Sequence, residues 1–318
     1  MTLRLVMMGT GEFALPAFLA LCDSPHEVVG LFTQPDRSGR GHHSHPHPMK
    51  DAALVRNVPV FQPENVNTQE FLDSLRWLNA DLCVVAAYGQ ILKRELLDIP
   101  KLGAVNIHAS LLPKYRGAAP IHHAIKAGET ETGITIFQIE PRLDAGPILL
   151  MERSPIGPEE TSGEVHDRLA KRAAPLILQV VEQLERGTAT PVSQPKVAPS
   201  LAPKMHKSSG TIDWTLSAKQ IHDHIRAMSP WPRAFTWIRH GDEEPKRLLV
   251  YKSGVLEQAS KHAPGCVVRA DDDHLSVQTG EGLLELLEVQ PEGKRVMNIA
   301  DFLHGHHLTP GDAFATPS

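Results

Sequence analysis

Short apolar runs alternate with helical patterns over residues 1–186, and this alternation is the strongest constraint on the fold. Such alternation is typical of strand-helix-strand units, whose parallel strands form a sheet that helices cover on both faces. The sequence predicts strands over 3–8, 28–33, 81–87, 104–107 and 133–139, and helices over 15–21, 69–78, 118–127 and 164–184. Ligands of such a sheet bind outside the carboxyl ends of its strands.

Four prolines at four-residue spacing end this pattern: Pro191, Pro195, Pro199 and Pro203. Neither a helix nor a central strand accepts proline at that interval, so an extended linker is expected. Beyond it, one helical pattern near 217–227 accompanies short alternating strands over 247–252, 265–269, 275–279 and 283–290, as in a small β-barrel. The sequence therefore predicts an α/β protein, with a Rossmann-like parallel sheet in 1–186, a linker in 187–206 and a smaller OB-like barrel in 207–318.

Length and composition narrow the class of protein. A chain of 318 residues with 41% hydrophobic residues can build two domains with their own cores. Its net charge of -5 argues against a generally basic nucleic-acid binder, but it permits a local basic patch. Three scattered cysteines do not form a disulfide framework, and no apolar run reaches the roughly 18–20 residues of a membrane span. We therefore expect a cytoplasmic protein without membrane association.

An amide, an imidazole and a carboxylate form the candidate catalytic set. Asn106 and His108 lie two apart at the end of a predicted strand, so both side chains point to one face. Asp144 follows the next apolar run, in Leu143-Asp-Ala-Gly146. An amide can stabilise an oxyanion, an imidazole can move a proton near neutral pH, and a carboxylate can orient that imidazole. This combination predicts acyl-type transfer.

Two other motifs carry weaker signals. Gly9-Thr-Gly11-Glu-Phe-Ala14 partly matches a dinucleotide fingerprint, but no acidic residue ends the second predicted strand, so a nicotinamide cofactor is disfavoured. Residues 38–48 hold several histidines among Ser, Gly and Pro, and nothing nearby supplies a rigid metal geometry. We expect no metal, and interpret this segment as a polar loop whose flanking basic residues can meet phosphate.

The motif Asn106-Ile-His-Ala-Ser-Leu-Leu-Pro113, followed by Arg116-Gly117 and by Leu143-Asp-Ala-Gly146, resembles the formyltransferases that use 10-formyltetrahydrofolate. Further segments are similar to the methionyl-tRNA formyltransferases within that group, and the resemblance covers nearly the whole chain. They include Phe32-Thr-Gln-Pro-Asp-Arg37, Ala87-Tyr-Gly89, Ile212-Asp-Trp214 and Ser229-Pro-Trp-Pro232.

The resemblance implies transfer of a formyl group from 10-formyltetrahydrofolate to the α-amine of methionyl-initiator tRNA. It implies that Asn106 holds the formyl oxygen, that His108 manages the proton of the amine, and that Asp144 orients His108. The folate contacts implied are Tyr88, Ser110, Leu111, Leu112 and Pro113.

The resemblance also implies that a loop after the second strand approaches the tRNA, with Arg37, Arg40 and His42 as contacts. Residues 207–318 carry 12 Lys and Arg against 15 Asp and Glu, which predicts weaker tRNA binding, a tightly localised basic face or partial reliance on His protonation. We expect a monomer. An amino sugar or nucleotide-sugar remains an alternative acceptor, and a catalytically retired RNA-binding protein is the alternative from another class.

Overall fold

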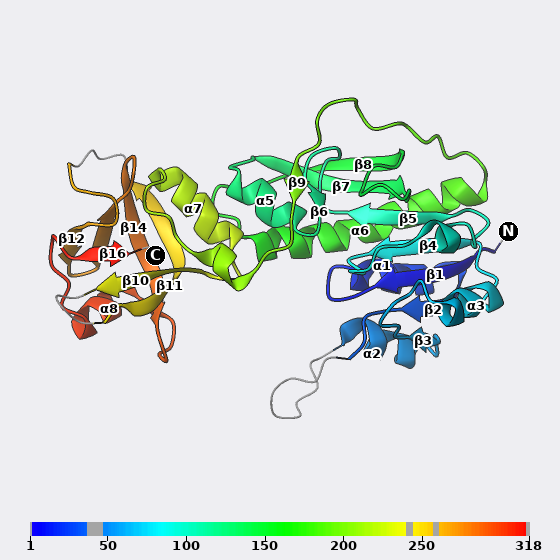
Figure 1. Cartoon of the computed structure of the whole chain (residues 1–318), viewed down its shortest axis with the longest axis horizontal. Coiled ribbons are helices and arrows are strands. Elements are labelled where there is room, and N and C mark those ends of the chain that lie inside the picture. The colour runs from blue at the N-terminus through cyan, green and yellow to red at the C-terminus, as the bar shows by residue number, and fades with distance from the viewer. Residues whose placement is uncertain (1, 37–46, 240–243, 257–260, 316–318) are drawn as a thin grey trace. The chain divides into compact units, whose positions relative to one another are not determined.

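The computed structural model describes residues 2–36, 47–239, 244–256 and 261–315, which form two compact units (Figure 1). The first unit comprises Met1–Pro120, Glu131–Pro155 and Val165–Pro203, and the second comprises Ile121–Thr130, Ile156–Glu164 and Lys204–Ser318. Within the described ranges, no helix is both long enough and apolar enough to cross a membrane.

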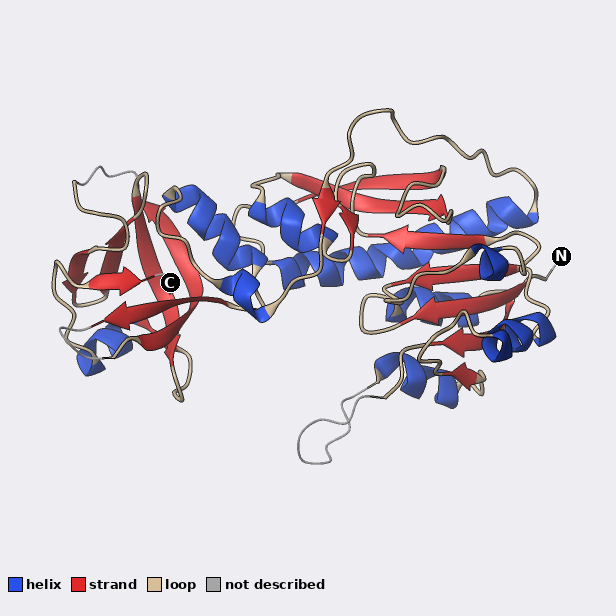
Figure 2. Ribbon diagram, viewed as in Figure 1, coloured by secondary structure: helices blue, strands red, loops and turns tan. Residues whose placement is uncertain are grey.

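A seven-stranded sheet in the order β3-β2-β1-β4-β5-β7-β8 forms the centre of the first unit (Figure 2). Its strands are β1 Arg4–Gly9, β2 Glu27–Phe32, β3 Val60–Phe61, β4 Leu82–Ala86, β5 Ala104–His108, β7 Glu131–Gln138 and β8 Ile148–Pro155. All five strands expected from the sequence in this unit are confirmed. The fully parallel arrangement was wrong, because β7 runs antiparallel to β5 and then pairs antiparallel with β8.

Both faces of this sheet are covered, as the apolar runs predicted. Leu5, Val6, Met7 and Met8 of β1 alternate between the two faces, and none is exposed to solvent. On one face, Val6 and Met8 belong to a core cluster that includes residues of α3 and α4. The helices of this unit are α1 Leu15–Cys22, α2 Pro48–Val55, α3 Gln69–Trp77, α4 Arg94–Leu97 and most of α6 Ser162–Glu185. Predicted helices at α1, α3 and α6 are confirmed, whereas α2 and α4 were missed.

The proline-rich segment is extended, as predicted, and packs along the first unit. We call residues 187–203 the strap. The strap pairs at two places: Val192 exchanges backbone hydrogen bonds with Ile148, and β9 (Leu201–Ala202) pairs in parallel with β6 (Arg116–Gly117). Proline spacing revealed the extended backbone but not these partners.

The second unit holds a near-closed antiparallel barrel with the strand order β12-β13-β14-β11-β10-β16. A bridge between Cys266 and Ala313 links its two ends. Its strands are β10 Ala234–Arg239, β11 Lys246–Leu256, β12 Val267–Asp271, β13 His274–Gln278, β14 Leu283–Pro291, β15 Met297–Asn298 and β16 Ala313–Ala315; its helical segments include α5 Pro120–Lys126, η1 Lys207–Gly210, α7 Ala218–Ala227 and α8 Ile299–Gly305. The predicted barrel and the predicted helices at α5 and α7 are confirmed.

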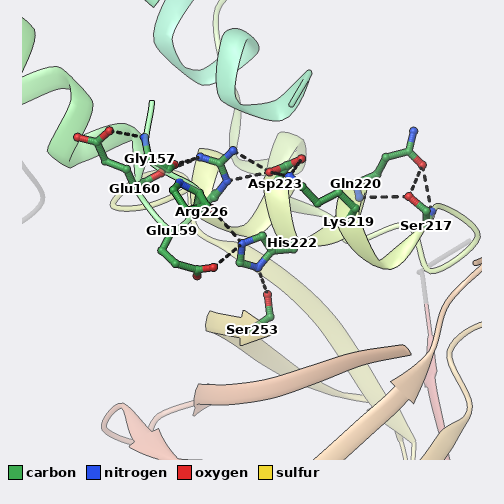
Figure 3. Close-up of polar contacts among 11 residues, drawn as sticks. Gly157, Glu159, Glu160, Ser217, Lys219, Gln220, His222, Asp223, Arg226 and Ser253 are labelled. Atoms are coloured by element: carbon green, nitrogen blue, oxygen red, sulfur yellow. Dashed lines mark hydrogen bonds and ion pairs between the residues drawn. The ribbon is translucent and has the colours of Figure 1, made fainter. Parts of the chain in front are cut away.

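A buried ion pair connects α7 with segment 156–164 inside the second unit (Figure 3). The Arg226 guanidinium lies 2.7 Å from Asp223 Oδ1, and both side chains are buried. Arg226 also donates to the carbonyls of Gly157 and Glu160, and Lys219 donates to the Asp223 carboxylate. Each buried charge therefore has an oppositely charged partner and further hydrogen bonds, the condition for keeping such a pair in the interior.

Candidate active site

β5 presents the first two residues of the candidate set on one face. Asn106 is half-buried, and its side-chain amide makes no hydrogen bond to another described residue. His108, the last residue of β5, is buried, and its ring packs edge-on against Phe137 of the neighbouring β7. The arrangement places an amide with free hydrogen-bonding capacity beside a fixed imidazole.

The contacts of His108 define which ring nitrogen carries the hydrogen. Nε2 lies 2.9 Å from the carbonyl of Tyr115, which can only accept, so Nε2 carries the hydrogen. Nδ1 of neutral His108 therefore bears the lone pair and lies 3.9 Å from Asp144 Oδ2. Burial lowers the pKa of His108 below its ordinary value, although Asp144 and the Tyr115 carbonyl act in the opposite direction. Burial thus favours the neutral ring, and a carboxylate lies beside its Nδ1.

Asp144 reaches His108 by a route that the sequence did not predict. The parallel-sheet expectation placed both motifs near the carboxyl ends of strands. Because β7 is antiparallel, its last residue, Gln138, pairs with Val105 near the beginning of β5. The loop between β7 and β8 then brings Asp144 to His108, where Asp144 Oδ2 accepts a hydrogen bond of 2.8 Å from Gly117 N.

Two glycines allow this close packing. Gly117 has φ +126°, and a Cβ there would lie 2.6 Å from the Ala202 carbonyl of the strap. A Cβ at Gly146 would lie 1.8 Å from the Gln138 carbonyl. Any side chain at these positions would push apart the segments that hold Asp144.

The segment after His108 forms a tightly bonded turn. Ser110 Oγ donates to the Lys114 carbonyl at 2.6 Å, and Thr135 Oγ1 donates to the Ser110 carbonyl at 2.6 Å. The Leu112 N–H donates to Thr135 Oγ1 at 3.2 Å, so Thr135 holds both ends of this short segment. In this structure Ser110 is fully buried and supports the backbone that follows His108.

Burial also constrains the predicted folate contacts. Tyr88 and Leu112 are nearly completely buried, Pro113 is buried and Leu111 is half-buried. Burial raises the pKa of the Tyr88 hydroxyl, which has no hydrogen-bond partner among the described residues. The folate contacts expected for Tyr88, Ser110, Leu111, Leu112 and Pro113 stay predictions.

The residues predicted to contact tRNA, Arg37, Arg40 and His42, lie outside the described residues. Among the residues that are described, no group of three or more His, Cys, Asp and Glu side chains could hold a metal ion. The structure also brings Thr135, Gln194 and Ser200 to the site, which sequence reasoning missed. Thr135 lies in a recognised strand, but Gln194 and Ser200 lie among prolines, where no periodic pattern marks them.

Comparisons with known proteins assign the chain to a family. The formyl transferase family model matches residues 3–181, and the model of the formyl transferase C-terminal domain matches residues 204–307. A methionyl-tRNA formyltransferase of Moorella thermoacetica is 43% identical over 311 residues, covering 98% of each chain. Its counterpart in Myxococcus xanthus is 43% identical over 309 residues, covering 97% of this chain and 96% of the relative.

Among solved structures, an N-formyltransferase from Helicobacter canadensis, crystallised with folinic acid and dTDP-3-aminofucose, matches with a TM-score of 0.65. It is 15% identical and the match covers 92% of this chain and 100% of that chain, a likeness of fold alone. The two full-length relatives and the two matching models carry the assignment. The chain belongs to the methionyl-tRNA formyltransferase family of formyl transferases.

Proposed function

We propose that this protein transfers the formyl group of 10-formyltetrahydrofolate to the α-amino group of methionyl-initiator tRNA. The single observation that carries the proposal is the Asn106, His108 and Asp144 set, in a chain 43% identical to a methionyl-tRNA formyltransferase over 98% of both lengths. The product, N-formylmethionyl-tRNA, serves translation initiation. We further propose that the protein is a cytoplasmic monomer.

Asn106 acts on the formyl oxygen. When the amine attacks the formyl carbon, negative charge builds on that oxygen in the tetrahedral intermediate. An amide donor aimed at this charge contributes roughly 100- to 1,000-fold in rate. The half-buried side chain of Asn106, whose amide has no partner among the described residues, fits this role.

His108 takes the proton that the attacking amine loses. Its free lone pair is on Nδ1, because Nε2–H is bonded to the Tyr115 carbonyl. Once Nδ1 is protonated, Asp144 stabilises the imidazolium at short range. The proton then passes toward the folate nitrogen as the carbon–nitrogen bond of the donor breaks, so the pair returns to its starting state.

The donor is expected to bind beside β5. The folate contacts remain those proposed above, with the buried turn of Ser110 through Pro113 shaping the wall behind the formyl group. Family membership supports a folate-based donor, and the N-formyltransferase from Helicobacter canadensis was crystallised with folinic acid. No metal is required for the steps assigned to the three residues.

The proposed acceptor follows from the similarity of the chain to its relatives along its whole length. An amino sugar would be formylated by the same three side chains, and the Helicobacter canadensis enzyme was crystallised with such a sugar, dTDP-3-aminofucose. At 15% identity that likeness supports the fold, whereas the relatives at 43% identity are methionyl-tRNA formyltransferases along their full length. A retired RNA-binding protein would have no chemical use for an intact Asn106, His108 and Asp144.

Formylation of charged tRNA tests the proposal directly. The full-length protein is incubated with 10-formyltetrahydrofolate and either methionyl-initiator tRNA or a dTDP-linked amino sugar. We expect N-formylmethionine on the tRNA and no formylated sugar. Transfer to the sugar alone would overturn the assigned acceptor, and no transfer to either acceptor would overturn the enzymatic role.

We expect the rate of formylation to fall in acid with a midpoint below pH 6.5. The neutral form of His108 is the active one, and burial lowers its pKa from the ordinary value of 6.5. The midpoint of the acid limb therefore lies below that pH. The measurement is kcat against pH at saturating concentrations of both substrates. A midpoint of the acid limb above pH 6.5 would contradict a neutral His108 base.

Changing His42 and His43 together to lysine should strengthen tRNA binding and steepen its dependence on salt. Lysine is charged at neutral pH, and each added phosphate contact steepens the slope of log K against log salt by about 0.7 to 0.9. The measurement is Kd for methionyl-initiator tRNA across a salt series. Replacing the same pair with glutamine, which adds no charge, is the matched control. An unchanged slope in the lysine variant would remove this segment from the tRNA contact.

A further inference from the structure

The strap reaches the catalytic loops through the side chain of Gln194. Gln194 Nε2 donates to the carbonyl of Asp144 at 2.8 Å and to the carbonyl of Gly146 at 2.9 Å. Its Oε1 accepts a hydrogen bond of 2.5 Å from Arg116 Nη2. Arginine can only donate and a carbonyl can only accept, so these partners determine the orientation of the amide. One side chain thus connects the Asp144 loop with the segment that follows His108.

The backbone of the strap holds that second segment as well. Ser200 Oγ accepts from Tyr115 N at 2.8 Å, and the Ser200 carbonyl accepts from Arg116 N at 2.9 Å. The Tyr115 carbonyl in turn accepts a hydrogen bond from His108 Nε2, and the Gly117 N–H donates to Asp144 Oδ2. The hydrogen-bond partners of both His108 and Asp144 are therefore themselves held by the strap.

Asp144 needs such support because of its backbone. Its φ is +43°, in the left-handed region that few residues other than glycine and asparagine or aspartate adopt. Gln194 bonds the carbonyls on both sides of Ala145 and so restrains the rotation of the chain around Asp144. The side chain of the restrained residue places Asp144 Oδ2 3.9 Å from His108 Nδ1.

We propose that Gln194 is a positioning residue for formyl transfer: it sets the distance between Asp144 and His108 by bonding the Asp144 loop and Arg116 at once. The inference rests on the proposed roles of His108 and Asp144. It gives the strap, which the sequence marks only as a connector, a part in the reaction. Glutamine suits the position because it combines a donor and an acceptor; glutamate keeps only the acceptor for Arg116, and methionine keeps neither.

The test compares Gln194→Met and Gln194→Glu with the wild-type protein and with Val197→Ala. Val197 lies in the same strap with an exposed side chain, so its variant controls for changes in strap sequence. Steady-state kcat and KM are measured with 10-formyltetrahydrofolate and methionyl-initiator tRNA, together with the thermal midpoint and the pH dependence of kcat. The Asp144→Asn variant is assayed in parallel.

We expect Gln194→Met to lower kcat by about 10- to 100-fold, the scale of effect of a small misplacement of reacting groups. KM for both substrates, the thermal midpoint and the Val197→Ala activity should stay near wild type. In Gln194→Glu, a second carboxylate beside Asp144 favours the imidazolium, so the acid limb of kcat should move to higher pH.

A wild-type kcat in Gln194→Met would overturn the inference. So would a Gln194→Met variant that loses kcat and thermal stability together, if Gln194→Glu shows no shift of the acid limb. The Asp144→Asn variant separates failure of the positioning role of Gln194 from failure of the proposed roles of His108 and Asp144. If Asp144→Asn is also fully active, those roles are wrong; if it is inactive while Gln194→Met is not, only the positioning role is wrong.

Discussion

Replacing Asp144 with asparagine should reduce kcat for formylation by at least about 100-fold while leaving the fold intact. The amide has the same shape, can still accept from Gly117 N and tolerates the left-handed backbone at this position. It carries no negative charge, so protonated His108 loses its stabilising neighbour. The pKa of His108 should fall further, which leaves a weaker base.

The measurement is single-turnover formylation of methionyl-initiator tRNA, together with circular dichroism and thermal unfolding. Asp73→Asn is the control, since Asp73 forms an exposed pair with Arg76 on α3, away from the candidate site. It should retain full activity. Near wild-type turnover in Asp144→Asn would show that the carboxylate charge plays no part in the reaction.

Removing the buried guanidinium of Arg226 should be the most damaging change to stability. Arg226→Met leaves the Asp223 carboxylate buried with only Lys219 as its ionic partner, and it deprives two carbonyls of their donor. Breaking a buried pair in this way costs about 3–5 kcal/mol in the free energy of unfolding. Denaturant titration with a probe in the second unit measures this loss.

Two further variants test whether the loss of stability comes from breaking a buried ion pair. The double change Asp223→Leu with Arg226→Met removes both charges and should recover part of the stability, because neither charge is then left alone. Arg186→Met breaks an exposed pair with Glu182 and should cost no more than about 1 kcal/mol. A loss in Arg226→Met as small as that of Arg186→Met would contradict the buried-pair argument.

Local patterns in the sequence predicted most of the elements. The β1 and β4 runs are apolar on both faces, and the spacing of Leu72 and Leu75 marks the buried side of α3. The shared orientation of Asn106 and His108 is likewise a local property of a strand. The sequence therefore predicted the strands of the sheet, the barrel and the shared face of Asn106 and His108 from neighbouring residues alone.

Long-range relations left no comparable signal. A buried strand has an apolar run whether it is parallel or antiparallel, so nothing in β7 indicated its direction. The contacts of Gln194 lie 48 to 78 residues away in sequence, and a polar residue between prolines shows no periodicity. The local motif of Ser110 likewise does not show that its hydroxyl donates to the Lys114 carbonyl or that its carbonyl accepts from Thr135.

The strap has a consequence for dividing this protein into fragments. A recombinant fragment that stopped at residue 186 would lose the backbone partners of Ile148, Arg116 and Ala119, which Val192, Ser200 and Ala202 supply. A fragment continued to Pro203 would retain all three, along with the Gln194 bridge. A fragment intended to keep the candidate active site should therefore end after Pro203 and not before Pro191.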